Sequence, residues 1–395
     1  MTERLPLAAR ARRIDLSATA AMVAAAARLR AAGEALVDFG AGEPDFPTPA
    51  HITAAARAAL AAGDTKYTPT AGTAALRAAV AAAHARDFGS GYAPAEVLVT
   101  DGGKHGLFNA ISILVDHGDE VILPAPYWVS FRDQITFAGG VPVRVAARAE
   151  DGFVPSLAAI EAALTPRTKA ILLNSPNNPS GAVFPPEFFR GVLALCRARG
   201  VWLLSDECYA RLVYETDPYS VGAEAGAKDC LVIAGSLSKT YAMTGWRIGY
   251  VLARAELIAP MLALQSHSTG NATTFAQAGA VAALSGPQEV VATMIAAYRR
   301  RRDLIVEGLR ALPGITCNLP GGAFYVFPRV EGVLQRAGLA SADELCQQLL
   351  QRAGMVTVSG EAFGSPGHIR FSYAAAEEEI REGLRRLRVF LDLLK

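Results

Sequence analysis

Two cations lie eight positions apart in "SLSKTYAMTGWRIGY" (236–250), a stretch that otherwise has the character of a half-buried segment. Lys239 stands among small hydroxyl residues directly after the apolar run "LVIAGS" (231–236), which predicts a lysine at the exit of a strand. A lysine amine held in that way can condense with an aldehyde to form a Schiff base. The guanidinium of Arg247 can hold a phosphate through two parallel hydrogen bonds. The alternative interpretation is that both side chains are simply solvated.

A carboxylate follows another apolar run, because Asp206 comes at the end of "VWLLSDE" (201–207). Taken alone, such an aspartate is typical of a helix cap or a turn. Beside a Schiff-base lysine on the next strand exit, it can pair with a protonated pyridine nitrogen and keep the ring electron-withdrawing. Asp206 and Lys239 together therefore predict a site for pyridoxal 5′-phosphate (PLP).

The elements that must position these groups can be recognised from seven short apolar runs, each bounded by turn residues. Helical patterns such as "GLFNAISILVDHG" (106–118) and "PPEFFRGVLALCRARG" (185–200) lie between several of them. This alternation predicts an α/β fold with a mostly parallel sheet that helices cover on both faces. The predicted strands are 97–100, 120–124, 141–145, 169–174, 201–207, 231–236 and 248–253.

Polar segments follow four of these strands, namely "DGGKHG", "SPNNPSG", "DECYARL" and "LSKTY". Ligands of such sheets bind beyond the carboxyl ends of the strands, so these exits predict one shared site. After "AAYRRRRDLIVEGLRAL" (297–312) the pattern changes to short strands and a final amphipathic helix, which predicts a smaller α+β unit joined near residue 299. The predicted parts are an N-terminal arm (1–15), a large domain (49–298) and a small domain (16–48 and 299–395).

Composition narrows the possible functions. The chain has 395 residues, 51% hydrophobic and 19% charged, enough for a large buried core. Its 38 basic residues against 37 acidic ones predict no nucleic-acid partner and no anionic membrane surface. The five cysteines form no C-x-x-C pair, so no metal site is predicted, and Cys208 is interpreted as a packed thiol rather than a nucleophile.

Two segments bear on the compartment. The start "MTERLPLAARARRIDL" (1–16) lacks the apolar core of a secretory signal, so a cytoplasmic enzyme is expected, with an organelle transit peptide as the alternative. The stretch 257–288 carries no formal charge, but "QSHSTGN" (265–271) interrupts it. We therefore predict no membrane span.

Seven motifs carry a resemblance to a known family. These motifs, which are spread over nearly the whole chain, resemble in identity and order those of PLP-dependent class I aminotransferases of fold type I, most closely the bacterial aspartate aminotransferase subgroup. The resemblance implies a mostly parallel seven-stranded sheet in the large domain and a smaller α+β domain. The motifs are "GEPDFPTP" (42–49), "TKYTPTAG" (65–72), "PYWVS" (126–130), "NSPNNPSGAVF" (174–184), "SDECYARLVYE" (205–215), "SLSKTYAMTGWRIG" (236–249) and "HIRFSYA" (368–374).

The resemblance also implies roles around the cofactor ring. Lys239 would bind the aldehyde and move the substrate proton, and Asp206 would hold the pyridinium. Asn178 and Tyr209 would hydrogen-bond the phenolic oxygen of the ring. Trp128 would stack on the ring face, although a lone aromatic residue after a strand is otherwise typical of a core.

The cofactor phosphate would be bound from two subunits. Tyr67 resembles the tyrosine that family members send across a dimer interface to the phosphate of the neighbour, which implies a homodimer with shared active sites. A tyrosine that caps a turn is the alternative. Gly270 stands where the family usually has a hydroxyl residue, which puts a second contact across the interface in doubt. The other phosphate ligands implied are the side chains of Arg247, Ser236 and Ser238 and the backbone N–H groups of Gly102 and Gly103.

The substrate contacts implied are fewer. Arg370 would bind the α-carboxylate in a bidentate pair, assisted by the N–H of Gly42, next to Trp128 and Asn178. Lys104 stands where aspartate-specific relatives use a lysine near the distal carboxylate. The alternative is that Lys104 only adds positive charge near the phosphate or faces solvent.

The expected reaction is ping-pong transfer of an amino group from an L-amino acid to a 2-oxo acid, with aspartate and 2-oxoglutarate as the best guesses. Ser266, uncharged where another subgroup supplies an arginine, leaves donor specificity open. Aromatic, basic or branched donors, a PLP-dependent β-lyase and a PLP-binding regulator without turnover are the alternatives. Such regulators tend to carry an added DNA-binding module, for which the chain has no spare residues.

Overall fold

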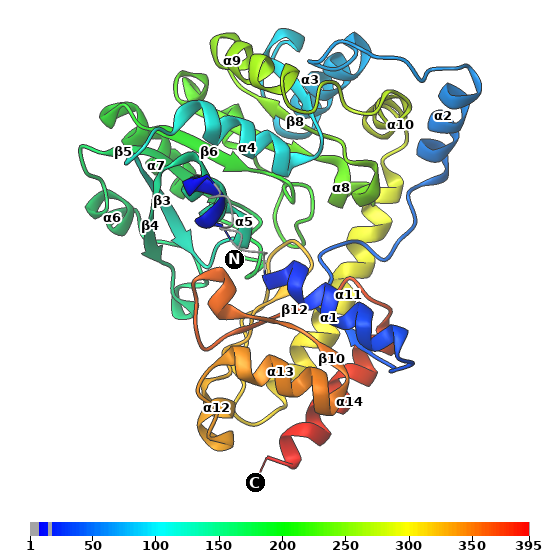
Figure 1. Ribbon diagram of the computed structural model, residues 1–395, viewed down its shortest axis with the longest axis vertical. Coiled ribbons are helices and arrows are strands. Elements are labelled where there is room, and N and C mark those ends of the chain that lie inside the picture. Colours follow the sequence, from blue (N-terminus) through cyan, green and yellow to red (C-terminus); the bar gives the residue numbers. More distant parts are fainter. Residues whose placement is uncertain (1–7, 15–17, 395) are drawn as a thin grey trace, which may run out of the picture.

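The computed structural model describes residues 8–14 and 18–394. Figure 1 shows a larger upper part built on one sheet and a smaller lower part that contains the C-terminal helices. The sheet has seven strands in the order β2-β8-β7-β6-β5-β3-β4. All seven predicted strands are present, within two residues at each end: β2 (Val97–Thr100), β3 (Glu120–Ala125), β4 (Val141–Ala146), β5 (Thr168–Asn174), β6 (Trp202–Asp206), β7 (Leu231–Ser236) and β8 (Gly249–Leu252).

The sheet is mostly parallel, as predicted. Only β8 runs antiparallel to its neighbours β2 and β7. In the parallel part Asn174 pairs with Asp206, and Asp206 pairs with Ala234, so β5, β6 and β7 end at one level. The polar residues that follow these strands therefore emerge side by side at one edge.

Helices cover both faces of this sheet because its strands are apolar on both sides. Successive residues of β6 illustrate this: Leu203 belongs to one hydrophobic core and Leu204 to another, and neither side chain is exposed. The helices of this part are α2 (Ala50–Ala61), α3 (Ala74–Phe88), α4 (Gly103–Leu114), α5 (Val129–Ala138), α6 (Leu157–Ala162), α7 (Pro186–Arg199), α8 (Leu237–Thr240), α9 (Ala255–Ser266) and α10 (Thr274–Ser285).

The smaller part has a core of its own, built around Tyr298, Phe324 and Phe371. The long helix α11 (Glu289–Arg310) runs from the upper part into the lower part in Figure 1 and includes residue 299. The other elements here are α1 (Ala18–Ala31), α12 (Glu331–Ala337), α13 (Ala342–Ala353), α14 (Glu377–Asp392), β1 (Val37–Asp38), β9 (Tyr325–Val326), β10 (Met355–Val356), β11 (Val358–Ser359) and β12 (Ile369–Ser372).

Short 3₁₀ helices complete the chain. Residues 1–7 and 15 of the predicted N-terminal arm lie outside the described residues, and Ala9–Arg12 forms one of these short helices. The others are Pro94–Glu96, Ala149–Asp151, Val221–Ala223, Ala227–Asp229, Thr244–Trp246 and Gly360–Phe363.

The length and apolar character of the helices bear on membrane spanning, for the described residues 8–14 and 18–394. Within them no individual helix combines the length and the apolar character that a bilayer crossing needs, and only α10 and α11, bent by 80° at their junction, meet the criterion as a pair.

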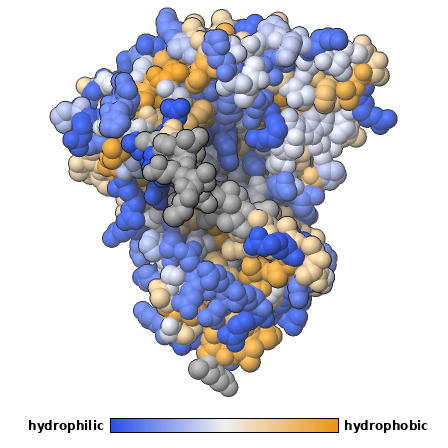
Figure 2. All heavy atoms as spheres, viewed as in Figure 1, coloured by the Kyte–Doolittle hydropathy of each residue, from blue (hydrophilic) through white to orange (hydrophobic). Residues whose placement is uncertain are grey.

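The surface in Figure 2 is hollowed between the larger upper part and the smaller lower part, with hydrophilic residues on both sides of the hollow.

Candidate active site

A cleft of about 420 Å³ lies at the carboxyl edge of β5, β6 and β7 and is closed from the other side by the smaller part. Most of the residues predicted for the site line it, so strand exits that are far apart in the sequence meet at one place. The predicted residues in the lining are Gly42, Gly103, Lys104, Trp128, Asn178, Asp206, Tyr209, Ser236, Ser238, Lys239, Arg247 and Arg370.

Lys239 reaches the cleft because β7 ends at Ser236 and α8 begins directly after it. The Ser236 hydroxyl accepts the N–H of Ser238 at 3.1 Å and caps this short helix. The Lys239 Nζ donates to the carbonyl oxygen of Gly42 at 2.5 Å. Burial lowers the pKa of Lys239 to about 8, because the charged ammonium loses its hydration. The amine is thus easier to deprotonate than an exposed lysine.

Asp206 stands at the exit of β6, and its residue is only 4% exposed. Its Oδ1 accepts the backbone N–H of Cys208 at 3.0 Å. Burial raises the pKa of Asp206 to about 6, and this hydrogen bond opposes the shift. A carboxylate desolvated to this extent gains strongly from a cationic partner, such as a protonated pyridine nitrogen.

Cys208 follows Asp206 and also lines the cleft. Burial raises the pKa of its thiol well above the ordinary value, and the neighbouring Asp206 raises it further. The thiolate, which is the reactive form, is therefore disfavoured. This agrees with the interpretation of Cys208 as a packing residue.

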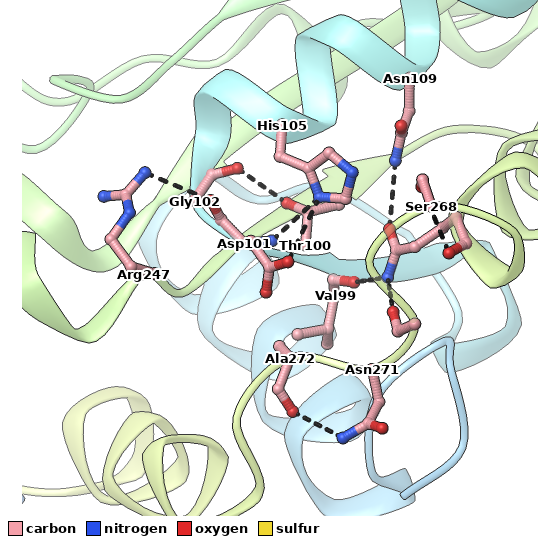
Figure 3. A network of polar contacts seen from close by, with 12 residues as sticks. Val99, Thr100, Asp101, Gly102, His105, Asn109, Arg247, Ser268, Asn271 and Ala272 are labelled. Carbon is pink, nitrogen blue, oxygen red and sulfur yellow. Dashed lines mark hydrogen bonds and ion pairs between the residues drawn. The ribbon is translucent and has the colours of Figure 1, made fainter. Parts of the chain in front are cut away.

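A cradle for an anion lies where β2 and β7 end and the antiparallel β8 begins. Gly102 has φ +85°, and a Cβ there would come within 2.6 Å of the Arg247 Nη2. A Cβ on Gly249 would come within 2.4 Å of the backbone of Gly102 and Gly103. Arg247 reaches over this turn and donates to the carbonyl oxygen of Asp101 at 3.2 Å (Figure 3). Only backbone without side chains permits this approach, and the positive end of α4, which begins at Gly103, faces the same place.

Arg370 enters the cleft from β12 in the smaller part. Its Nη1 donates to Asn178 Oδ1 at 2.9 Å, and its Nη2 donates to the carbonyl oxygen of Gly40 at 2.8 Å. The buried Nε has no hydrogen-bond partner among residues 8–14 and 18–394. Burial also lowers the pKa of this guanidinium. A buried donor without a partner is costly, so this side chain is suited to an incoming carboxylate.

Lys104 and Trp128 lie together in the lining. The Lys104 Nζ is 4.8 Å from the centroid of the Trp128 ring. Burial lowers the pKa of Lys104, and the positive charge of Arg247 lowers it further. Because the charge of Arg247 acts on the pKa of Lys104, Lys104 is a second cation close to the anion cradle.

Tyr325 is a site residue that the sequence did not reveal. Its hydroxyl is 2.8 Å from that of Tyr209, and it lines the cleft from β9. Burial raises the pKa of Tyr209 well above the ordinary value, and Tyr325 raises it further. Both phenols therefore stay protonated and able to donate. The alternating run "GGAFYVF" (321–327) indicated only a strand, and no local signal distinguished this tyrosine from a core residue.

Two predicted residues are not in this lining. Gly102 lies next to the lining, in close contact with the guanidinium of Arg247. Tyr67 lies on the loop after α2 and is 97% exposed. Its own subunit does not bring this tyrosine to the cleft, so its predicted contact with a neighbouring subunit stays a prediction.

Comparisons with known proteins decide the family. The profile described as aminotransferase class I and II matches residues 34–387. This chain belongs to that family. The prediction from the seven motifs is therefore confirmed, and so is the fold class.

The similar proteins cover almost the whole chain. An aspartate aminotransferase of Geobacillus stearothermophilus is 42% identical over 98% of this chain and 99% of the relative. An aspartate/prephenate aminotransferase of Thermus thermophilus is 44% identical over 96% of this chain and 97% of the relative. Among solved structures, aspartate aminotransferase from Thermus thermophilus with maleate has a TM-score of 0.93 and 42% identity, covering 98% and 99% of the two chains.

The protein is a transaminase, and its cofactor is PLP. The described residues fit this group. The glycine turn and Arg247 offer a cradle for an anion, Asp206 offers a desolvated carboxylate, and Lys239 offers an amine of lowered pKa in the same cleft. The part that each residue plays toward the cofactor remains a prediction.

The glycine cradle leads to a first prediction. Gly249→Ala should weaken PLP binding about tenfold or more, because the new methyl group displaces the Gly102–Gly103 backbone that forms the cradle. Gly245→Ala is the matched control, since a Cβ there meets no atom within 4 Å. Titration of each apo-protein with PLP, followed by absorbance, measures the affinity. Equal affinity of the two variants, with equal urea midpoints, would remove this turn from the site.

The pKa of Lys239 leads to a second prediction. Only the neutral amine attacks an aldehyde, so the rate at which the apo-protein captures PLP should rise about tenfold per pH unit and level off near pH 8. Stopped-flow absorbance measures this rate between about pH 6 and pH 10. A rate that still climbs with the same slope above about pH 9 would mean an ordinary lysine pKa.

Proposed function

We propose that this transaminase moves the amino group of L-aspartate to 2-oxoglutarate by a ping-pong mechanism. The observation that carries this proposal is a cleft with two cations besides Lys239 and Arg247, the residue assigned to the cofactor phosphate. Arg370 has a buried Nε without a described partner, and Lys104 lines the same cleft. Two cations suit a substrate with two carboxylates, and the relatives named aspartate aminotransferase support the same choice.

When bound, PLP supplies an aldehyde that captures amino groups and a ring that withdraws electrons from the substrate. Asp206 keeps a negative charge where that ring nitrogen needs one. Arg370 orients the substrate by its α-carboxylate, so that the Cα hydrogen lies within reach of Lys239. The Lys239 amine, about half of it neutral at pH 8, would then remove the Cα proton and return it to the carbon that was the aldehyde carbon of the cofactor, two bonds further on. Tyr209, with its raised pKa, stays a hydrogen-bond donor at the ring.

Two features support a homodimer with shared active sites. Tyr67 is almost fully exposed in the single subunit, and its motif resembles the one from which family members send a tyrosine to the neighbouring subunit. Arg247, in the anion cradle, is likewise exposed in the single subunit. A second copy that brings its Tyr67 to this cradle would cover both groups.

The domain boundaries predicted from the sequence are part of the proposal. The segments 16–48 and 299–395 would move as one small domain against 49–298, with α11 as the connection. Arg370 and Asn178 stand on opposite sides of that boundary and are already hydrogen-bonded. Substrate binding at Arg370 would thus favour closure. The cytoplasmic location stays a prediction.

The reaction of the purified holo-protein with single amino acids tests the substrate. We expect aspartate and glutamate to convert the bound cofactor to its amine form and to yield oxaloacetate and 2-oxoglutarate. In Lys104→Met, kcat/KM for aspartate should fall about tenfold or more, while that for an apolar donor such as leucine stays the same. Absorbance of the cofactor and assay of the oxo acid measure both.

A control variant and the outcomes expected for other reaction types complete the substrate test. Lys169→Met is the matched control, because Lys169 lies in β5 outside the cleft lining. Ammonia release with pyruvate would indicate a β-lyase, and an unchanged spectrum with every amino acid would indicate a binding protein. Prephenate belongs in the set of acceptors because three relatives are named aspartate/prephenate aminotransferase.

Arg370 leads to a further prediction. Arg370→Lys should keep the fold and the bound cofactor but weaken binding of every amino acid about tenfold or more, because a bidentate pair worth roughly 1.5–3 kcal/mol is lost. Spectral titration with a non-reacting substrate analogue such as maleate measures the affinity. Unchanged affinity would remove Arg370 from the substrate site. The loss should be equal for aspartate and leucine, which separates this variant from Lys104→Met.

A further inference from the structure

Two buried glutamines hold the loops on either side of Tyr67, although neither lines the cleft. Gln265 lies in the last turn of α9, Gln277 lies in α10, and each is 1% exposed. A buried side-chain amide is retained when its donors and acceptor are all used. What these two amides bind therefore indicates what they do.

Gln265 connects four segments of its own subunit. Its Nε2 lies 3.0 Å from the Thr70 carbonyl oxygen, 2.9 Å from that of Val99 and 3.2 Å from that of Gly270. Its Oε1 accepts the side-chain N–H of Asn109 at 3.1 Å. Figure 3 shows Asn109 above and Val99 below the central amide, with Gly102 on the turn between β2 and α4 and Arg247 reaching toward this turn from the segment before β8.

Gln277 makes the second connection. Its Oε1 accepts the backbone N–H of Thr73 at 2.8 Å, and its Nε2 donates to Thr68 Oγ1 at 3.0 Å and to the Ala272 carbonyl oxygen at 2.8 Å. The Thr274 hydroxyl also donates to the Lys66 carbonyl oxygen at 2.6 Å. The residues on both sides of Tyr67 are therefore hydrogen-bonded, while the Tyr67 side chain itself points into solvent.

Two loops are joined in this way, the Tyr67 loop (62–73) and the 267–273 loop. Gln265 contacts both of them and also β2 and α4, the elements that form the anion cradle of its own subunit. The amide hydrogen bonds therefore fix the position of Tyr67 relative to the cradle. The backbone N–H of Val99 also donates to the Ala71 carbonyl oxygen at 3.0 Å, so the amides add to a backbone attachment at the end of the Tyr67 loop.

We propose that Gln265 and Gln277 are positioning residues for the neighbouring subunit: they hold Tyr67 in place for the cofactor phosphate bound there. This inference rests on the homodimer of the proposed function and adds the residues that build its shared contact. A loop position defined to within about half an ångström matters, because a hydrogen bond from a phenol to a phosphate weakens steeply with distance and angle. The defect of a Gln265 variant must then appear in the site of the other subunit.

Mixed dimers test this directly. One subunit carries Lys239→Ala together with Gln265→Met, which matches glutamine in size but lacks its hydrogen bonds, and the other subunit is unchanged. Only the unchanged subunit forms the lysine-bound chromophore, so its absorbance reports PLP affinity at the site that receives Tyr67 from the variant subunit. Two different affinity tags purify the mixed dimer, and a mixed dimer with Lys239→Ala alone is the reference.

We expect the PLP dissociation constant of the unchanged subunit to rise about tenfold, and a subunit with Tyr67→Phe to produce the same effect. Gln277→Met should act in the same direction and serves if Gln265→Met does not fold. Gln288→Met is the control, because its amide donates to the carbonyl oxygens of Ala283 and Gly286, away from both loops. An unchanged PLP affinity of the unchanged subunit, in mixed dimers with either glutamine variant, would overturn the inference.

The possible outcomes distinguish this inference from the homodimer proposal and from the aspartate proposal. A monomer in sedimentation experiments would overturn the homodimer and this inference together. A dimer in which Tyr67→Phe acts across the interface, but neither glutamine variant does, would overturn the inference alone. The aspartate proposal is independent of both results, because donor specificity is measured on homodimers with Lys104 variants.

Discussion

Exclusion of water from the exits of β6 and β7 is the constraint on which the site depends. It shifts two groups toward their neutral forms, Asp206 to a pKa of about 6 and Lys239 to a pKa of about 8. The same burial therefore makes the amine nucleophilic and makes the carboxylate require a cationic partner. A protonated pyridine nitrogen would satisfy the carboxylate, and an aldehyde on the same ring would use the amine, which is why these two residues suit PLP.

Anion binding in this cleft depends on close approach as much as on charge. The backbone at Gly102, Gly103 and Gly249 leaves no room for a Cβ, so N–H groups at the start of α4 and the guanidinium of Arg247 can surround one phosphate. Arg370 differs, because it is supplied by the smaller core and is hydrogen-bonded across the cleft to Asn178. The predicted cofactor contacts thus lie mainly at the sheet, and the predicted substrate contacts come from both parts.

Much of the architecture could be predicted, because strand residues such as Leu203 and Leu204 are apolar on both faces of the sheet and are bounded by turns. Most site residues followed from the rule for strand exits and from seven local motifs. Tyr325 and Gln265 could not be found in this way. Tyr325 lies in an ordinary alternating strand, and Gln265 lies at the polar end of an apolar helix, so their partners come from segments more than 100 residues away in the sequence.

The sequence by itself determined the fold class, the family and the chemistry at the strand exits, because these depend on local patterns of apolar residues, glycines and charges. Only the tertiary structure decided which donors are left without partners and which amides hold which loops. Arg370 Nε is buried without a described partner, whereas Gln265 uses its whole amide. The reason is physical: desolvation and hydrogen bonding are properties of a packed environment, and that environment is assembled from segments that no local pattern connects.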